Sequence, residues 1–349
     1  MTLFTVDDAP VPRPKRPITA GRVVGMVTTA LVFVTVVGAG AWGLMNTQRV
    51  ADQFTVWNFD PSARLQQYID RSTMAGDGEF LFLASTPAIE TPATFDSVCS
   101  SREEDVGILG CYLPGAKTIH LFDVTDVRLD GLAEVVASHE MLHAAWDRMT
   151  AEDQGALAPL LEAEAARLSG DEKFAARLEF YARTEPGERL NELHSIIGTE
   201  IVDISDALES HYAVYFSDRH AVTDLHETSN AVFVEHQRRI EELVAEMDAL
   251  VAAKDADYAA YNAGYDALGK DVNSFNVRAN NGEFSSQSQF NRERNTLIRR
   301  QADLDALYLT IDAKVIAYNA LIAELASLNA EGADLNRSIN IEPPRTPEL

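Results

Sequence analysis

Positive charge is scarce in this sequence. It has 29 lysine and arginine residues against 54 aspartate and glutamate residues, a formal net charge of −25 over 349 residues. Basic clusters on the scale of a nucleic-acid footprint are absent, so binding to a polyphosphate backbone is electrostatically opposed, and we exclude a nucleic-acid partner. Since 46% of the residues are hydrophobic, the chain can bury a sizeable core, which excludes a disordered protein.

Cysteine is nearly absent. Only Cys99 and Cys111 occur, a short stretch apart. A disulfide between them is the natural interpretation, worth roughly 2–4 kcal/mol and typical of compartments outside the cytoplasm. Two unpaired buried thiols are the alternative.

Charged residues are missing from the run VVGMVTTALVFVTVVGAGAWGLM at 23–45. As a helix that rises 1.5 Å per residue, this run spans a hydrocarbon core of ~30 Å, which predicts a transmembrane helix. A cleaved secretory signal is the alternative, since AGA at 39–41 resembles a cleavage site. The run is about twice as long as the ~7–15 apolar residues of such a signal, so we favour a retained anchor.

The charges on either side of this run predict its orientation. Arg13, Lys15, Arg16 and Arg22 precede it, whereas Arg49 is the nearest positive charge after it. The positive-inside rule therefore predicts a cytoplasmic tail at 1–22. We expect a single-pass protein of the cell membrane whose remaining, acidic part lies outside the cytoplasm.

The middle of the chain changes character along its length. FDPSARLQQYIDRS at 59–72 has apolar residues at helical spacing, which predicts a short helix. Between 79 and 126 the short apolar runs EFLFLAST, GILGCYL and TIHLFDV predict strands, with a turn at PGAK. From 129 to about 216 glycine and proline become few and the helical period dominates. We expect an α+β domain with a small, mostly antiparallel sheet.

The last third of the chain shows heptad spacing. Residues at intervals of four and three, apolar except for Lys254, are Ile240, Val244, Met247, Val251, Lys254, Tyr258, Tyr261, Tyr265, Leu268, Val272 and Phe275. A second run consists of Leu297, Gln301, Leu304, Tyr308, Ile311, Val315, Tyr318, Ile322 and Leu325. Between them, Gly282 is placed to end one helix and Ser285 or Ser286 to cap the next. So short a connection predicts an antiparallel coiled-coil hairpin.

The segment ASHEMLHAAWDR at 137–148 carries the chemistry that composition does not reveal. Zn²⁺ binds neutral imidazoles, and His139 and His143, four residues apart on a helix, project from one face closely enough to share one ion. Glu140 can then reach a water at the open position of that ion and take its proton as a general base. The motif predicts a catalytic zinc site.

The surroundings of the motif support this interpretation. The two histidines share one helical stripe with apolar residues, and the stripe consists of Leu132, Val135, Val136, His139, Leu142, His143 and Trp146. Both imidazoles are therefore expected to face the protein interior. Two core histidines that bond only to backbone groups are the alternative.

SHEMLHAAWDR, followed by NELHSIIGTE at 191–200, resembles the gluzincin group of zinc metallopeptidases. The resemblance covers residues 75–220 by motif and order, and it implies a third ligand from a glutamate on a separate downstream helix. The same two segments and the coiled-coil tail also resemble a group of membrane-anchored bacterial proteins.

Glu192 is the third ligand that we expect. Asn191 and Glu192 resemble the Asn-Glu pair of several gluzincins, and Glu192 lies 49 residues beyond His143. Glu200 is the main rival, because it lies two turns further along and only ~80° round the helix. His194 is a weaker rival.

Two departures from family patterns bear on the site. The metzincin pattern requires glycine and histidine where this chain has Trp146 and Met149, so that group is excluded. Many gluzincins carry an acidic residue at the place of Ile196, where it orients a histidine ligand. In this chain Asp147, one turn past His143, is the candidate for that task.

Hydrolysis of an amide also needs a donor for the oxyanion. The segment HYAVYFSDRH at 211–220 follows the expected ligand helix, and its candidates are His211, Tyr212, Tyr215, Arg219 and His220. We choose Tyr215. The resemblance further implies that TIHLFDV binds an extended peptide by edge pairing.

The leading hypothesis is a membrane-anchored, extracytoplasmic zinc metallopeptidase that acts on a peptide or protein substrate of the cell envelope. Its expected parts are a cytoplasmic tail at 1–22, a transmembrane helix at 23–45, a metallopeptidase-like domain at 55–222, a hairpin at 223–338 and a disordered tail at 339–349. The alternative is an envelope scaffold that acts through the hairpin and carries a structural or vestigial zinc site. In either case the hairpin is a candidate for partner binding or self-association.

Overall fold

The structure is a computed structural model of the chain and describes residues 20–99, 109–184 and 187–339. The chain divides into two compact units, Met1–Phe59 and Asp60–Leu349. Almost all of the predicted tails at 1–22 and 339–349 lies outside the described residues.

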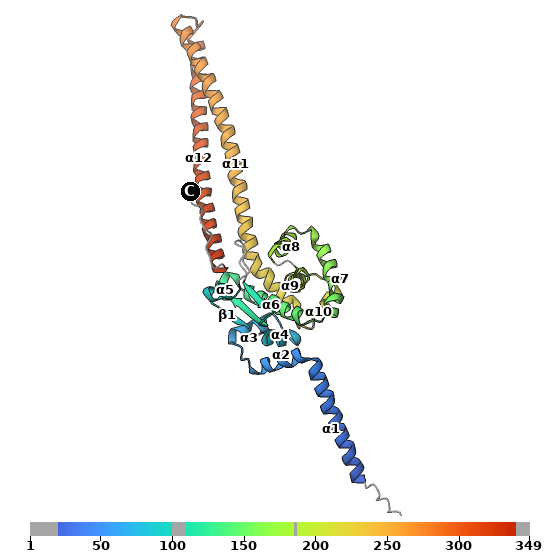
Figure 1. The fold of residues 1–349 in the computed structure, drawn as a ribbon. Helices are drawn as coiled ribbons and strands as arrows, with labels where there is room; N and C mark the ends of the chain where they lie inside the picture. Colours follow the sequence, from blue (N-terminus) through green and yellow to red (C-terminus); the bar gives the residue numbers. More distant parts are fainter. Residues whose placement is uncertain (1–19, 100–108, 185–186, 340–349) are drawn as a thin grey trace, which may run out of the picture. The chain divides into compact units, whose positions relative to one another are not determined.

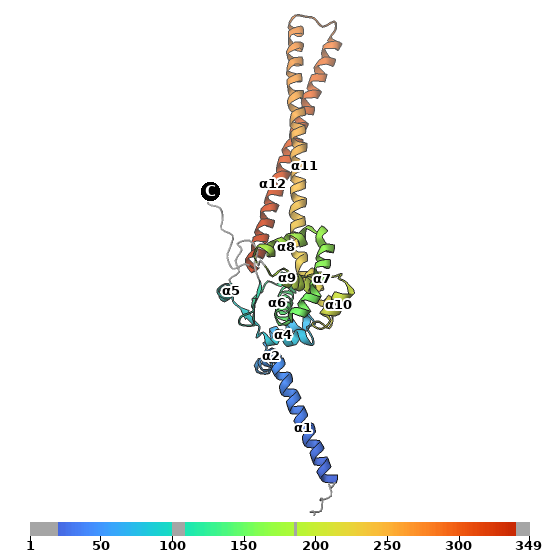
Figure 2. The same cartoon turned by 45° about the vertical axis from the view of Figure 1, so that its right-hand side comes forward.

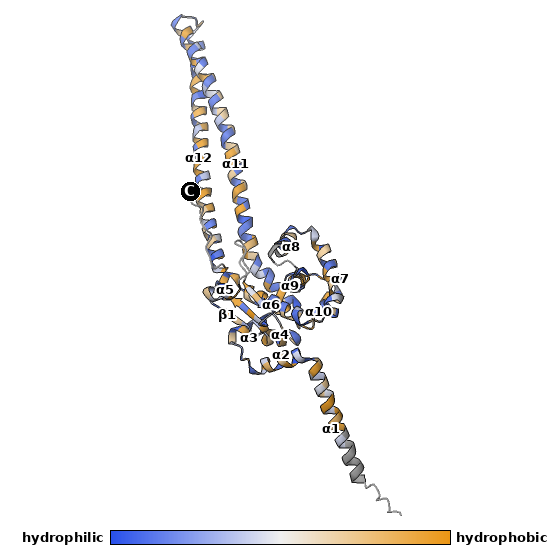
Figure 3. Ribbon diagram, viewed as in Figure 1, coloured by the Kyte–Doolittle hydropathy of each residue, from blue (hydrophilic) through white to orange (hydrophobic). Residues whose placement is uncertain are grey.

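The described part of the first unit, residues 20–59, contains two helices, α1 (Ala20–Met45) and α2 (Thr47–Asn58). The predicted helix at 23–45 is therefore present, and most of its coloured part is hydrophobic (Figure 3). Among the described residues, two segments are long and apolar enough to cross a membrane. They are α12 (Gln287–Ile339) and the pair Leu31–Met45 with Thr47–Asn58, which is bent by 93°. Length and composition are the only marks of a membrane span that these segments carry.

In the described residues of the second unit the sheet has three strands, β1 (Ala88–Glu90), β2 (Gly110–Leu113) and β3 (Thr118–Phe122). Their order is β1-β3-β2; β3 pairs in parallel with β1 and antiparallel with β2. The prediction of a mostly antiparallel sheet was wrong, because the sheet is mixed. After β1 the chain continues into the helix α5 (Pro92–Val98) and not into a tight turn. This longer connection allows β1 to pair in parallel with β3, because parallel strands cannot be joined by a short turn.

The predicted strand at 79–86 is instead the helix α4 (Asp77–Ala84). A short, continuous apolar run fits a buried helix as well as a buried strand, so its pattern could not decide between them. Gly78 permits the helix to lie against the chain near Tyr215, since a Cβ at this glycine would be 2.1 Å from the Tyr215 carbonyl oxygen. The predicted helix at 59–72 is confirmed as α3 (Ala63–Arg71), capped by Ser62.

Helix α6 (Leu132–Arg148) lies at the centre of the globular part of the second unit, at the base of the hairpin (Figures 1 and 2). It packs against α3, α4, β2, β3, α9 (Arg189–Glu200) and the start of α11 (Arg219–Asn280). The remaining described elements of the domain are η1 (Val127–Leu129), α7 (Ala151–Arg167), η2 (Leu168–Gly170), α8 (Glu172–Thr184) and α10 (Asp206–Tyr212). The largest fully buried side chains include Phe82, Ile119, Met141, Leu161, Ile196 and Tyr212.

Cys99 and Cys111 form a disulfide, as the sequence predicts. The bond joins the end of α5 to β2. Cys99 also belongs to a buried apolar cluster with Phe95, Phe122, Val124, Leu129 and Leu335. Because Leu335 comes from α12, this cluster holds the base of the hairpin onto the sheet.

Helices α11 and α12 form the predicted antiparallel hairpin and lie side by side in both views (Figures 1 and 2). Gly282, in the left-handed region at φ 72°, follows the first arm. The backbone N–H of Gln289 donates to Ser286 Oγ at 3.1 Å, so Ser286 caps the second arm. The first arm begins at Arg219 and packs on α6 and α9 before it leaves the domain.

The contact between the two arms differs from the predicted seam. Leu243, Leu268, Phe275, Leu304 and Ile311 are buried. Six residues of the predicted seam are 39–57% exposed instead, namely Val244, Tyr258, Tyr265, Tyr308, Val315 and Ile322. Half of the predicted seam is confirmed, because Leu268, Phe275, Leu304 and Ile311 belong to it. At the other half the buried position is displaced by one residue, as Leu243 is buried and Val244 is exposed. The physical reason is that two helices without a third bury only a narrow stripe of each other.

Candidate metal centre

The motif helix α6 is buried on nearly all sides. Val135, Leu142 and Trp146 of the predicted stripe are buried, and so are Ala137, Ser138, Glu140, Met141 and Ala144. The other stripe residues, including the two histidines, are half-buried. The helix starts after Gly131, which adopts φ 92° where Leu225 of α11 packs against it. A helix enclosed in this way holds its side chains in fixed positions, which a metal site requires.

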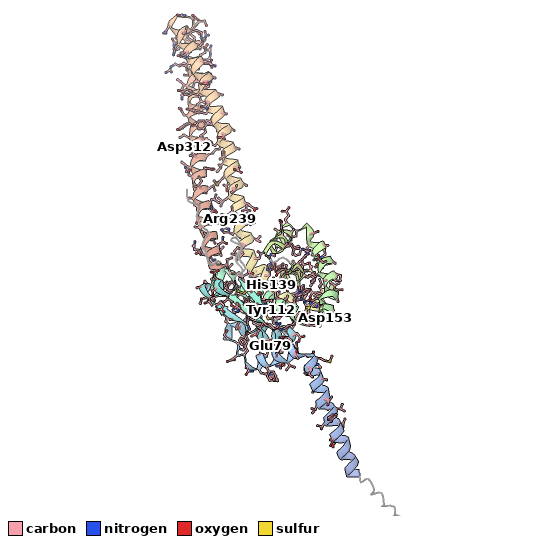
Figure 4. All side chains as sticks on the ribbon, viewed as in Figure 1. Glu79, Tyr112, His139, Asp153, Arg239 and Asp312 are labelled. Carbon is pink, nitrogen blue, oxygen red and sulfur yellow. A yellow bond between two sulfur atoms is a disulfide. The ribbon has the colours of Figure 1, made fainter. Side chains whose placement is uncertain are left out.

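His139, His143 and Glu192 meet in the interior of the domain. Their possible ligand atoms all lie within 4.8 Å of one another. His143 Nε2 is 3.4 Å from Glu192 Oε1, and His139 Nε2 is 3.8 Å from Glu192 Oε2. Ligand atoms bound tetrahedrally to one zinc lie ~3.3 Å apart, so the three groups are close to the spacing that one ion requires. Figure 4 labels His139 among the helices of the domain.

The imidazole of His143 is oriented by two groups from α9. Its Nδ1 lies 2.8 Å from Asn191 Oδ1 and 3.2 Å from Ser195 Oγ. Asn191 Nδ2 in turn donates to Glu188 Oε2, which assigns the amide oxygen to the histidine. Nδ1 therefore carries the proton, and the lone pair of Nε2 points towards Glu192.

Asp147, the predicted brace for His143, lies elsewhere. Its Oδ2 accepts from Tyr112 OH at 2.8 Å and from Lys117 Nζ at 2.7 Å. It thus ties the β2–β3 connection to the end of α6. The prediction was wrong because a residue four positions past His143 lies one turn along the helix, and here that turn faces the sheet, not α9.

Both histidines of the cluster have a lowered pKa. Burial lowers the pKa of His139 well below its usual value, and the neighbouring His143 lowers it further. Burial also lowers the pKa of His143, although the bond with Asn191 opposes the shift. Lowered pKa values keep both rings neutral near pH 7, and the neutral ring is the form that binds a metal.

The two rival third ligands are engaged away from the cluster. His194 Nε2 lies 2.9 Å from His211 Nε2, and the His194 ring packs against Trp146. Glu200 forms an ion pair with Arg177. Of the three acid and histidine candidates on α9, the structure brings Glu192 to the two motif histidines.

Glu140 is buried beside the edge strand β2. A Cβ added to Gly110 would lie 2.7 Å from Glu140 Oε1, so only glycine leaves room for this carboxylate. The strand TIHLFDV, expected to pair with a peptide, is β3 at the centre of the sheet, where both of its edges are hydrogen-bonded. That expectation was wrong, and the edge strand next to Glu140 is β2.

The five candidates for an oxyanion donor have different surroundings. Tyr212 OH donates to the His194 carbonyl, and Arg219 donates to the carbonyls of Ile201 and Val202 at the end of α9. Both side chains therefore have structural partners. His220 is exposed at the start of α11.

His211 and Tyr215 remain from this set. Their rings contact each other at 5.5 Å, and both lie beside His194. Burial raises the pKa of Tyr215 to about 12, so its hydroxyl keeps its proton and can donate.

Two functional features escaped the sequence analysis. Ser195 and Asn191 lie four residues apart, on one face of a helix, and this spacing was the available signal for the brace on His143. Gly198 permits α9 to approach the motif helix, since a Cβ there would lie 2.5 Å from Leu142 Cδ1. From the sequence alone, a glycine that allows such a close contact looks the same as a glycine that merely destabilises its helix.

Comparisons with family models, with curated proteins and with solved structures gave no match. The function of the centre has to be judged on its own geometry and chemistry.

Proposed function

We propose that the chain is a membrane-anchored zinc metallopeptidase in which His139, His143 and Glu192 hold the metal. The observation that carries this proposal is the meeting of the three side chains from two separate helices. Two neutral imidazoles and one carboxylate suit zinc, and three protein ligands leave the fourth position open, as in catalytic rather than structural zinc sites.

The residues around the cluster have distinct tasks in this proposal. Zinc bound there lowers the pKa of a coordinated water and polarises the scissile carbonyl. Glu140 takes the proton of the attacking water and passes it to the leaving amine. Tyr215 is the candidate donor to the oxyanion, and β2 is the strand along which an extended peptide pairs.

The compartment is part of the same proposal. Helix α1 anchors the chain, with residues 1–22 in the cytoplasm, as the four basic residues of that tail indicate. The disulfide between Cys99 and Cys111 supports an oxidising environment for the domain, because such bonds persist outside the cytoplasm. The enzyme then acts on peptides or proteins of the cell envelope.

The test separates binding of the metal from chemistry. Purified full-length chain is assayed for zinc content and for hydrolysis of an unfolded protein such as casein. Glu140→Gln should keep one zinc per chain and lose at least a hundredfold in kcat, since removal of a general base costs about 10²–10⁴ in rate. Glu152→Gln, at an exposed position of α7, is the matched control and should retain full activity.

Two results would overturn the enzyme assignment. In one, the Glu140→Gln chain cleaves casein as fast as the unaltered chain. In the other, the unaltered chain holds zinc and cleaves no peptide in a broad library. The second result would favour the scaffold alternative, because a structural site has no use for a general base.

A further inference from the structure

The exposed half of the predicted seam forms a surface of its own. Val244, Val251, Tyr258, Tyr265 and Val272 recur every seventh residue along α11, and Tyr308, Val315 and Ile322 do so along α12. We call these eight residues the apolar flank. Six of them are 39–57% exposed, and the two remaining valines are half-buried.

Both arms turn this flank to the same side of the hairpin. The rings of Tyr261 and Tyr265 stack at 6.1 Å, and Tyr261 contacts Tyr308 of the other arm at 5.8 Å. Tyr261 and Tyr308 also line a hollow with Asp305 and Leu309. Tyrosines of both arms thus form one continuous surface across the seam.

The opposite side of the seam is closed by ion pairs between the arms. One of them, Arg239 with Glu324, lies nearer the base of the hairpin. The other three are Asp257 with Lys314, Asp271 with Arg300, and Arg278 with Glu293. On α11 the buried residues Leu268 and Phe275 share one heptad position. The residues of these three ion pairs occupy the neighbouring position on one side of that row, and Tyr258 and Tyr265 occupy the neighbouring position on the other side. The hairpin therefore has a charged, closed side and an apolar, open side.

The open side is rimmed by acidic residues. Glu241, Asp248 and Asp255 follow its outer border on α11, and Asp305 and Asp312 follow it on α12. Figure 4 labels Asp312 part of the way along that arm. In residues 240–269 and 301–323 there are ten acidic and two basic residues. Both lysines, Lys254 and Lys314, already form ion pairs within the hairpin.

The size of the flank suits a helix. From Val244 to Val272 it is ~42 Å long at 1.5 Å per residue, and two adjacent helices of ~10 Å each make it ~20 Å wide. The flank residues of α12 span only ~21 Å, so the apolar area is about 600 Å², or three quarters of the ~800 Å² that one partner contributes to a standard stable interface. Figure 3 shows hydrophobic residues along the length of both arms.

We propose that the apolar flank docks an amphipathic helix of another protein whose apolar stripe is bordered by lysine and arginine. Charge decides between the possible occupants. A second copy of the hairpin would set one acidic rim against another, and an anionic lipid surface would be repelled in the same way. A helix with lysine and arginine along both borders of its apolar stripe is attracted electrostatically to both acidic rims. This docking is independent of the metal centre.

The experiment uses the full chain in nanodiscs and three labelled 28-residue peptides. All three share one leucine and isoleucine heptad stripe, and the positions beside it are lysine, glutamine or glutamate. By fluorescence anisotropy at 150 mM salt, the lysine peptide should bind at least tenfold more tightly than the glutamate peptide. The double variant Asp305→Asn with Asp312→Asn should shrink this difference, since it removes charge from one rim.

Variants of the flank complete the test. Tyr265→Ser with Val315→Ser should weaken binding of the lysine peptide at least tenfold. Val277→Ser, a matched change at a 58% exposed valine of α11 off the flank, should leave it unchanged, with helix content checked by circular dichroism.

The proposal fails if the lysine and glutamate peptides bind equally, or if both sets of variants weaken binding alike. It also fails if the chain is a dimer that the flank variants dissociate, because the occupant is then a second copy. Zinc content measured on the same samples keeps these outcomes apart from the fate of the metal centre.

Discussion

The domain around α6 and the hairpin of α11 and α12 use similar apolar helices in opposite ways. In the domain, helices and the sheet cover α6 on nearly all sides, and three of the enclosed polar groups converge on one point. Where the hairpin extends beyond the domain, each arm packs on the other arm as its described neighbour, and six apolar residues of the expected seam stay exposed. Helical periodicity therefore predicts that a helix has an apolar face, whereas the number of elements packed against the helix decides whether that face is buried.

The largest expected effect comes from the same truncation made in both regions. Leu142→Ala removes a fully buried side chain of α6 and should lower the free energy of unfolding by about 2–5 kcal/mol. Leu309→Ala, at a 67% exposed position of α12 outside the flank, should change it by no more than ~0.5 kcal/mol. Urea unfolding followed by circular dichroism measures both. Equal losses would abolish the contrast between the regions.

A pair of glycines makes the same comparison at the level of backbone packing. Gly198→Ala in α9 places a Cβ against Leu142 and Tyr212, and should cost about 1–3 kcal/mol and weaken zinc binding, because α9 carries Glu192. Gly269→Ala in α11 meets nothing within 4 Å and should stabilise the chain by about 0.5–1 kcal/mol. Thermal unfolding and a zinc titration are the measurements. A Gly198→Ala chain with unaltered zinc affinity would contradict the close packing of α9 on α6.

The sequence predicted which side chains meet at the centre better than it predicted the groups around them. The spacing of His139, Glu140 and His143 is dictated by the helix itself, so the pattern carried its own geometry. The resemblance supplied Glu192. The brace on His143 was missed because the spacing of Asn191 and Ser195 shows only that they share one face of α9, and tertiary packing decides that this face meets His143.

The fold shows the same division. The disulfide, the short helix α3 and the hairpin with its Ser286 cap were predicted from local signals. The strand at 79–86 and the mostly antiparallel sheet were wrong, and half of the predicted seam of the hairpin is exposed. All three depend on which neighbour an apolar residue meets, and composition and period are silent on that.

The pH dependence of stability should also differ between the regions. Burial lowers the pKa of His226, where α11 leaves the domain, to about 4, and Arg177 contributes. The unfolded chain binds this proton near pH 6.5, so the stabilisation is complete above pH 6.5 and is lost as the pH falls towards 4. At pH 5 the loss is about 2 kcal/mol.

His226→Gln should remove that loss. Urea unfolding at pH 8 and pH 5, with EDTA present to exclude metal binding, gives the difference for each chain. The exposed control His220→Gln should behave as the unaltered chain does. A pH difference that is unchanged in His226→Gln would show that the buried histidine has no part in acid sensitivity.

The smallest expected effect lies on the closed side of the hairpin. The pair Asp257 and Lys314 is a quarter exposed at each side chain, and such pairs contribute only about 0.2–1 kcal/mol in water. A double-mutant cycle of Asp257→Asn and Lys314→Gln at low and high salt measures the coupling, which should shrink as salt rises. A coupling free energy of several kcal/mol would contradict this expectation, because it would mean that the ion pair stabilises the hairpin as strongly as a buried contact stabilises the domain core.

Zinc titration of the purified full chain tests the central claim most directly. We expect one zinc per chain, and a loss of at least tenfold in affinity in each of His139→Ala, His143→Ala and Glu192→Gln. The exposed-histidine control His220→Ala should keep the affinity of the unaltered chain. A chain that binds no zinc, or one whose affinity survives Glu192→Gln unchanged, would contradict the assignment of these three side chains as one metal centre.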